Sequence, residues 1–210
     1  MTEHTSAPAG RRASVAQSRY RYPAGLVTAS LVTSGWVLLY ALYRGYYAVG
    51  GTAGMIGTFK SASEWRALNL AGAVVLLAVA VLPAAMLPLW RRPALRRVLL
   101  GLCWVLAVGF LMHALVQDVQ RVLSLTGHLH ISYPAQWKTL NRHAADIQDL
   151  AFNETWFLVS GLLWGVVGWI GLGRSRARRW WAWSALAAIA ALTVLGLVTA
   201  SGLIGRSVIG

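Results

Sequence analysis

Residues 152–169, FNETWFLVSGLLWGVVGW, form an apolar run in which Glu154 is the only charged residue. Because about 20 helical residues cross a bilayer core, this run predicts a transmembrane helix. Gly161 and Gly165 form a G-x-x-x-G pair, and small residues mark the face on which membrane helices approach closely. With about 100° between successive residues, Glu154 shares this face. We therefore expect Glu154 to face protein rather than lipid.

The rest of the chain shows the same character, because 57% of its 210 residues are hydrophobic and only 12% are charged. This composition indicates a membrane protein rather than a soluble domain. The predicted fold is an all-α polytopic membrane bundle of five transmembrane helices, within a single domain over residues 23–210. Residues 1–22 are polar, basic and rich in Ser and Ala, and are predicted to form a disordered cytoplasmic tail. The predicted spans cover residues 24–43, 68–89, 98–116, 151–172 and 181–204.

The basic residues lie in short clusters between the spans, although the net charge of +13 would suggest nucleic acid binding in a soluble protein. This clustering indicates membrane topology, and we expect no nucleic acid partner. Cytoplasmic segments are enriched in Lys and Arg, so the N-terminus is predicted to be cytoplasmic and the C-terminus extracytoplasmic, in a multi-pass protein of the cell (inner) membrane. Twelve arginines would then lie inside: Arg11, Arg12, Arg19, Arg21, Arg91, Arg92, Arg96, Arg97, Arg174, Arg176, Arg178 and Arg179.

This orientation gathers five of the six acidic residues and four of the five histidines on the outer side. If the third and fourth spans pack antiparallel, Leu106 would face Gly161 and Leu102 would face Gly165. His113 and Glu154 would then meet near the outer interface as a catalytic acid–base pair. The residues predicted to bind substrate beside this pair are Arg44, Gln117, Tyr40 and Trp156.

Structural roles compete with each of these assignments. Asn153 and Glu154 could form the N-terminal cap of a helix, where a carboxylate also interacts favourably with the helix dipole. His113 could form an interhelical hydrogen bond, and Arg44 could anchor its helix at the interface. The aromatic stripe of the first span, which includes Tyr40 and Tyr47, is more typical of an interfacial belt than of a substrate wall.

Metal and cofactor sites receive weaker support from the sequence. Four potential metal ligands lie in the third loop: His128, His130, His143 and Asp146. Their spacing matches no recognised metal motif, and a partly helical interfacial loop starting near Pro134 is the favoured interpretation. Cys103 is the single cysteine, which excludes an internal disulfide. A haem would find only His113 as an axial ligand within the spans, so no cofactor is expected.

Two stretches carry a resemblance to a known group of proteins. ALYRGYYAVGGTAGMIG, residues 41–57, and NETWFLVSGLLWGVVGW, residues 153–169, resemble segments of small actinobacterial polytopic membrane proteins of unknown function. In those proteins an Asn-Glu-Pro-Trp-Phe pattern opens a span, whereas here Thr155 stands in place of the proline. The resemblance covers two of the five spans and implies no activity.

A looser similarity is to membrane-bound terpene cyclases, which are small, Trp-rich proteins that protonate an alkene or epoxide with a carboxylic acid. The eleven tryptophans and an inward Glu154 are compatible with that chemistry. The leading hypothesis is therefore a membrane-embedded acid–base enzyme acting on a lipophilic substrate, isoprenoids being among the candidates. The alternatives are a proton-coupled small-solute permease or an accessory subunit of a membrane complex, with homo-oligomerisation through small-residue faces.

Overall fold

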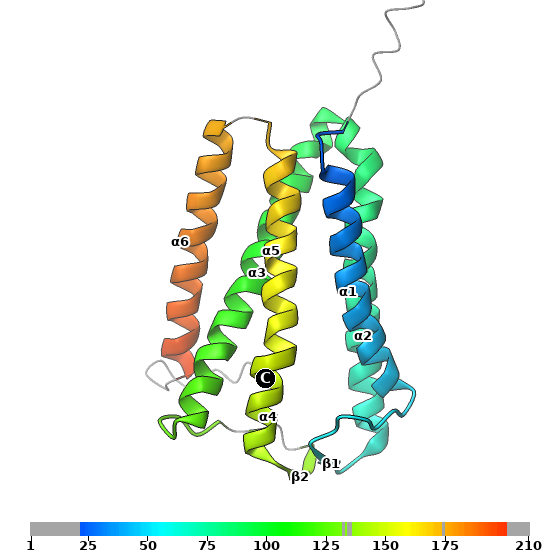
Figure 1. Ribbon diagram of the computed structural model, residues 1–210, viewed down its shortest axis with the longest axis vertical. Coiled ribbons are helices and arrows are strands. Elements are labelled where there is room, and N and C mark those ends of the chain that lie inside the picture. Colours follow the sequence, from blue (N-terminus) through cyan, green and yellow to red (C-terminus); the bar gives the residue numbers. More distant parts are fainter. Residues whose placement is uncertain (1–21, 132, 134–135, 174, 201–210) are drawn as a thin grey trace, which may run out of the picture.

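The computed structural model describes residues 22–131, 133, 136–173 and 175–200, and it is built from long helices (Figure 1). In this part of the chain, five helical segments are long and apolar enough to cross a membrane, which confirms the predicted number of spans. The predicted tail, apart from Tyr22, and the predicted end of the fifth span lie outside the described residues. The principal helices are α1 (Leu26–Ala48), α2 (Ala62–Met86), α3 (Pro93–Leu125), α4 (Arg142–Gln148), α5 (Glu154–Gly171) and α6 (Ser175–Ala200).

Local sequence sets several helix boundaries. The Ser61 hydroxyl accepts a hydrogen bond from the Glu64 N–H at the start of α2, and the Asn141 side chain accepts one from the Ala144 N–H at the start of α4. These caps satisfy backbone donors that have no partner inside the helix. Pro93 lies at the first position of α3, where its missing N–H costs nothing. After α2, which contains Pro83, the chain tightens into a 3₁₀ turn, Leu87–Arg91.

The helices follow one another across the bundle in the order α6, α3, α5, α1 and α2 (Figure 1). α1 packs against α2 and α5, and α3 packs against α5 and α6. α3 extends well past the predicted end of its span at residue 116, so it carries polar residues to the end of the bundle. The predicted antiparallel pairing of the third and fourth spans is confirmed by the packing of α3 on α5.

The register between α3 and α5 differs from the prediction. A Cβ atom at Gly161 would meet Leu111 and the Ala107 carbonyl rather than Leu106, and one at Gly165 would meet Ala107 rather than Leu102. The physical reason is that Cys103 and Ala107, which are small and buried, present a flatter face to the glycines than Leu102 and Leu106 do. Small residues on both helices allow the backbones to approach closely.

Gly161→Ala should lower the free energy of unfolding by about 1–3 kcal/mol, the usual cost of overpacking a tight interface. The added Cβ would lie 3.0 Å from the Leu111 backbone nitrogen and 3.1 Å from the Ala107 carbonyl oxygen, and backbone atoms cannot rotate away. Gly165→Ala is the matched control on the same helix face, because its Cβ would meet atoms only at 4.0 Å. Chemical denaturation followed by tryptophan fluorescence measures both variants, and equal stability of the two would contradict this packing.

A short antiparallel sheet, which the sequence analysis did not predict, joins the first and third loops. Strand β1 (Gly57–Phe59) pairs with β2 (Trp137–Leu140), and the Thr58 and Thr139 hydroxyls lie 2.7 Å apart. A Cβ atom at Gly57 would collide with the Thr139 carbonyl, so only glycine fits there. The Phe59 ring centroid lies 3.8 Å from that of Trp65 and 3.9 Å from that of Trp137. The sheet therefore holds two distant loops over one end of the bundle, here called the sheet end.

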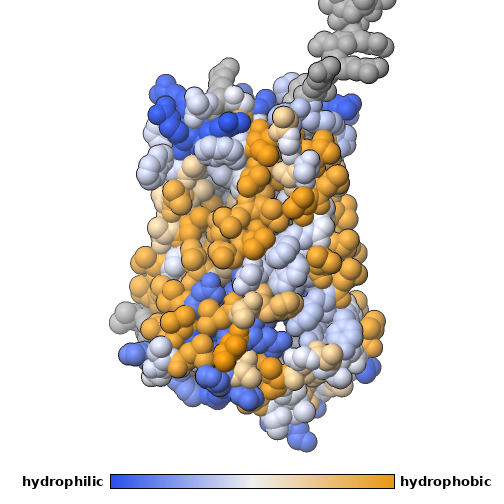
Figure 2. All heavy atoms as spheres, in the orientation of Figure 1, coloured by the Kyte–Doolittle hydropathy of each residue, from blue (hydrophilic) through white to orange (hydrophobic). Residues whose placement is uncertain are grey.

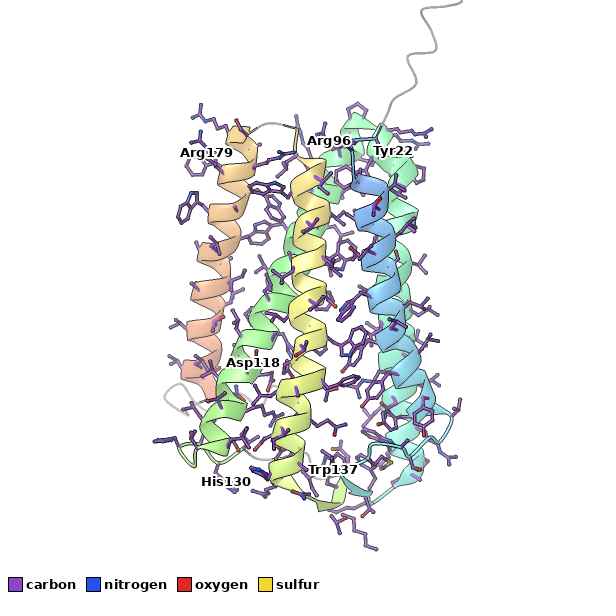
Figure 3. All side chains as sticks on the ribbon, viewed as in Figure 1. Tyr22, Arg96, Asp118, His130, Trp137 and Arg179 are labelled. Carbon is purple, nitrogen blue, oxygen red and sulfur yellow. The ribbon has the colours of Figure 1, made fainter. Side chains whose placement is uncertain are left out.

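The opposite end, here called the arginine end, contains the arginines around the α2–α3 and α5–α6 connections. Figure 3 shows Arg96 and Arg179 at this end with Tyr22, whereas His130 and Trp137 lie at the sheet end and Asp118 in the half nearest to it. Figure 2 shows a hydrophilic rim at the arginine end, a broad hydrophobic band, and hydrophilic residues mixed with hydrophobic ones toward the sheet end. The two ends thus differ in chemistry as the charge pattern predicts.

The buried core lies in the half of the bundle nearest the arginine end. Trp90 and Trp164 are fully buried there, and the Arg96 guanidinium donates to the Gly171 carbonyl, which closes the end of α5. The core residues are apolar, with Cys103 as the one ionisable member: Leu26, Met86, Trp90, Leu99, Cys103, Ala107, Trp164 and Val167. The buried carboxyl groups of the described residues, Asp146 and Glu154, lie in the other half, whereas the buried polar groups Ser30 and Thr33 lie on α1 toward the arginine end.

Candidate functional site

Glu154 and His113 meet in the half of the bundle nearest the sheet end, as the antiparallel pairing predicted. The His113 Nε2 atom lies 3.6 Å from the Glu154 Oε2 atom, a distance for an ion pair but too long for a hydrogen bond. Glu154 is 5% exposed, and its Oε2 atom is buried with no hydrogen-bond partner. The His113 side chain is 44% exposed and its ring packs edge-on against Phe157. A buried oxygen without a donor is costly, so this carboxyl group requires an explanation.

The N-terminal cap explanation for Glu154 is wrong. The chain is already helical when it reaches this residue, because α4 continues into a single π-helical turn, Asp149–Asn153, which leads directly into α5. Asn153 has helical backbone angles and makes no capping hydrogen bond. Thr155, the residue in the place of the expected proline, donates its hydroxyl hydrogen to the Leu150 carbonyl in the widened turn. Such turns occur often at functional sites.

Asn153 instead belongs to a chain of polar contacts that spans the bundle. Its side-chain oxygen accepts a hydrogen bond from the Tyr40 hydroxyl at 3.2 Å, and its amide nitrogen donates to Asp149 at 2.6 Å. Asp149 forms an ion pair with Arg121 at 2.8 Å, and Arg121 also contacts Asp146 at 3.3 Å. The network therefore links α1, the π turn, α3 and α4.

Arg121 forms ion pairs with Asp146 and Asp149 rather than with Asp118, which precedes it by three residues on its own helix. Asp146 lies on α4, which packs onto the end of α3, and Asp149 begins the π turn that follows α4. Asp146 also accepts hydrogen bonds from Ser124 at 2.7 Å and from the Tyr133 hydroxyl at 2.5 Å. Burial, reinforced by the hydrogen bond to Asp146, raises the pKa of the Tyr133 phenol above its ordinary value, so Tyr133 stays a donor at neutral pH.

These contacts also bear on the metal-site hypothesis for the third loop. Asp146 is committed to Arg121, Ser124 and Tyr133, while a His130 ring nitrogen lies 2.7 Å from Arg142. The expected helix near Pro134 begins only at Arg142, and β2 precedes it. Within the described residues no three His, Cys, Asp or Glu side chains are placed together to hold a metal ion.

The predicted substrate residues lie in different surroundings. Tyr40 is buried, and its ring stacks on Trp156 with centroids 5.5 Å apart, so both fill the contact between α1 and α5. Tyr47 is equally buried, and its hydroxyl donates to the Ala53 carbonyl in the first loop. The interpretation of Tyr40 and Tyr47 as an interfacial belt is therefore wrong, because both side chains face protein. Gln117 is half-buried, and no hydrogen bond in the described part of the chain joins it to the pair.

Arg44 lies apart from the Glu154–His113 pair. Its Nη1 atom donates to the Asn69 side-chain oxygen at 3.1 Å, and Asn69 is itself buried and donates to the Trp65 carbonyl. Arg44 lines a cavity of about 300 Å³ at the sheet end, here called the sheet-end cavity. Side chains from α1, α2, β2 and the π turn contribute to its wall, among them Tyr43, Arg44, Tyr47, Trp65, Trp137 and Asp149.

Sequence reasoning missed Asp149, Arg121, Asn69 and Tyr133 as members of the polar interior. One signal was present, since Asp146, Asp149 and Asn153 follow one another at helical spacings of three and four. Models of protein families, curated proteins and solved structures were compared with the chain, and none matches. The functional argument therefore depends on the site itself.

Proposed function

We propose that the protein is a membrane-embedded acid–base enzyme acting on a lipophilic substrate, with Glu154 as the proton donor and His113 as its partner. The observation that carries the proposal is the Glu154 carboxyl group, which is buried, lacks a hydrogen-bond donor on Oε2 and lies 3.6 Å from the only nearby imidazole described. Ionisable groups inside membrane helices are costly and are functional candidates by default. The helix-cap alternative no longer accounts for this residue.

The pair is arranged for proton transfer to a ligand that approaches from the His113 side. Glu154 is buried at the start of α5, whereas the half-exposed His113, whose ring packs against Phe157, connects the carboxyl group to the surroundings. In this proposal Glu154 protonates the substrate, and His113 takes up the proton released later and returns it to Glu154. The Phe157 ring, which packs against His113, favours a cationic intermediate. Protonation of a lipophilic substrate by a carboxylic acid is also the chemistry of the membrane-bound terpene cyclases, and we propose a reaction of this kind.

The packing supports the enzyme over the permease. A proton-coupled permease needs a polar route through the membrane, whereas the core toward the arginine end is filled by Trp90, Trp164 and aliphatic residues. The polar network described above is confined to the other half. The lipid bilayer and a lipophilic small molecule are the proposed partners. Homo-oligomerisation would need faces other than that of Gly161 and Gly168, since Leu111 and Trp181 cover these glycines.

The experiment that tests the function compares lipid conversion by matched proteins. Wild-type protein and the Glu154→Gln variant, each in phosphatidylcholine nanodiscs, are incubated with a total lipid extract of the source organism, and the extract is analysed by mass spectrometry. We expect a lipid species that decreases, and an isomer or hydration product that increases, only with the wild type. The same conversion by both proteins would overturn the assignment of Glu154, and conversion by neither would overturn the enzyme proposal.

We further propose that the arginine end faces the cytoplasm and that the protein resides in the cell membrane. A reporter inserted within residues 174–179 should be cytoplasmic, and one fused after Gly210 should be extracytoplasmic, because Lys and Arg accumulate in cytoplasmic segments. Alkaline phosphatase and green fluorescent protein fusions measure the two positions independently. Both reporters on one side would contradict the proposed topology.

A further inference from the structure

The sheet-end cavity is distinct from the Glu154–His113 pair, since neither residue lines it. Its wall is aromatic on several sides, with Tyr43, Tyr47, Trp65 and Trp137, and apolar at Met55 and Ile56. A volume of about 300 Å³ is at the small end for ligand sites. The cavity therefore suits the head group and first carbon atoms of a ligand, with the remainder extending outside it.

The two arginines that line this cavity, Arg44 and Arg121, differ in whether they form ion pairs. Arg121 is ion-paired with both Asp146 and Asp149, of which only Asp149 lines the cavity, and Asp149 also accepts a hydrogen bond from Asn153. Arg44, in contrast, contacts the neutral amide of Asn69 and the face of the Tyr40 ring, and forms no ion pair with any described residue. A guanidinium carries five N–H donors, so several remain for a ligand. Of the charged side chains that line the cavity, two are arginines (Arg44 and Arg121) and one is an aspartate (Asp149), so the lining carries a net positive charge.

We propose that the sheet-end cavity binds the anionic head group of an amphiphilic molecule, a phosphate or a carboxylate, with Arg44 as its principal donor. The planar fork of a guanidinium matches both groups with two parallel hydrogen bonds. Met55 and Ile56 provide an apolar surface for the carbon atoms next to the head group. A cationic head group is disfavoured because it would lie against an unpaired arginine.

This inference rests on the proposed function only in taking the bound amphiphile as the substrate. Asn153 lines the cavity and is followed directly by Glu154 on the same helix. In this proposal a head group held by Arg44 anchors one end of the molecule, and its next segment has to pass Asn153 to reach the acid. Binding at Arg44 and proton transfer at Glu154 are separate events, and each can be lost without the other.

The test is a binding titration of full-length protein in phosphatidylcholine nanodiscs with dodecyl phosphate, dodecanoate, 1-dodecanol and inorganic phosphate. Trp65 and Trp137 line the cavity, so tryptophan fluorescence reports occupancy. We expect saturable binding of at least one anionic amphiphile and none of 1-dodecanol. Arg44→Gln should weaken that binding by about tenfold or more, since hydrogen bonds between charged groups contribute at least this much.

Controls separate loss of the ligand site from loss of the fold. Arg66→Gln alters an exposed arginine on α2 that does not line the cavity, and it should bind like the wild type. Arg44→Lys should recover part of the affinity, because it keeps the charge, whereas a folding defect at Arg44 would weaken both variants equally. Glu154→Gln should bind normally although it is inactive.

Four results would overturn the inference: binding unchanged by Arg44→Gln, equal weakening by Arg44→Gln and Arg44→Lys, binding of 1-dodecanol equal to that of the anions, or binding of neither anionic amphiphile. If inorganic phosphate binds at the same concentration as dodecyl phosphate, the cavity is a site for anions in general. That result would overturn the proposal that it recognises an amphiphilic molecule. If neither anionic amphiphile binds but lipid conversion still depends on Glu154, this inference is wrong and the proposed function stands.

Discussion

Replacing Glu154 by glutamine is expected to lower the rate of lipid conversion by at least about 10²-fold, the usual contribution of a general acid. Glutamine has the same shape and fills the same buried space between His113 and the α3–α5 interface, but it has no proton to donate. The variant should therefore insert and fold like the wild type. Rates come from the mass-spectrometric assay, and folding from tryptophan fluorescence and size-exclusion chromatography.

The partner residue gives this prediction a second, independent test. His113→Asn should reduce the rate comparably, and the double variant should be little worse than either single variant, because groups that act as one unit are not additive. Glu64→Gln, which alters an exposed glutamate near the start of α2, is the matched control and should keep full activity. A double variant whose losses multiply would mean that the two residues act separately.

Arg121→Ala is expected to lower the free energy of unfolding by about 3–5 kcal/mol, the cost of leaving buried charges unpaired. The Arg121 side chain is 13% exposed and its partner Asp146 only 4% exposed, so water cannot replace the guanidinium. Removing it leaves two carboxylates of the α4 segment, Asp146 and Asp149, facing each other without a cation. Chemical denaturation in detergent micelles measures this loss.

The control for this prediction is Arg66→Ala, which removes an exposed arginine without a described ion pair and should cost less than about 1 kcal/mol. Arg121→Lys should fall between the two, because an ammonium keeps the charge but cannot span both carboxylates as the guanidinium fork does. A loss for Arg121→Ala no larger than that for Arg66→Ala would show that the network contributes nothing to stability.

Much of the fold could be predicted because hydropathy is a local property. The five spans were found from their length and composition alone, and these depend on no contact between helices. The β1–β2 sheet was missed because the pairing of Thr58 with Thr139 joins residues far apart in the chain. The α3 residues that face Gly161 and Gly165 differ from Leu106 and Leu102, because helical periodicity predicts a stripe on one helix but not its register against the next.

Only the contact between two consecutive spans, the third and the fourth, could be predicted from the sequence, because these two spans pack side by side. His113 and Glu154 were brought together by the antiparallel pairing of consecutive spans, which short-range reasoning can supply. The partners of Arg121, Asp146 and Asp149, could not be predicted from its own helix because they lie 25 and 28 positions further along the chain. Arg44 was expected beside the acid, but its hydrogen bond to Asn69 holds it at the cavity.

The π turn between Asp149 and Asn153 has a consequence for how this chain can change in length. An α-helix rotates about 100° per residue, and a π turn accommodates one residue more than an α turn. Deleting Leu150, Ala151 or Phe152 would leave hydropathy almost unaltered, yet would rotate Asp146 and Asp149 around the helix axis relative to Glu154. Substitutions at Leu150, Ala151 and Phe152 would leave the polar network in place, but a single-residue deletion there would separate the network from the acid.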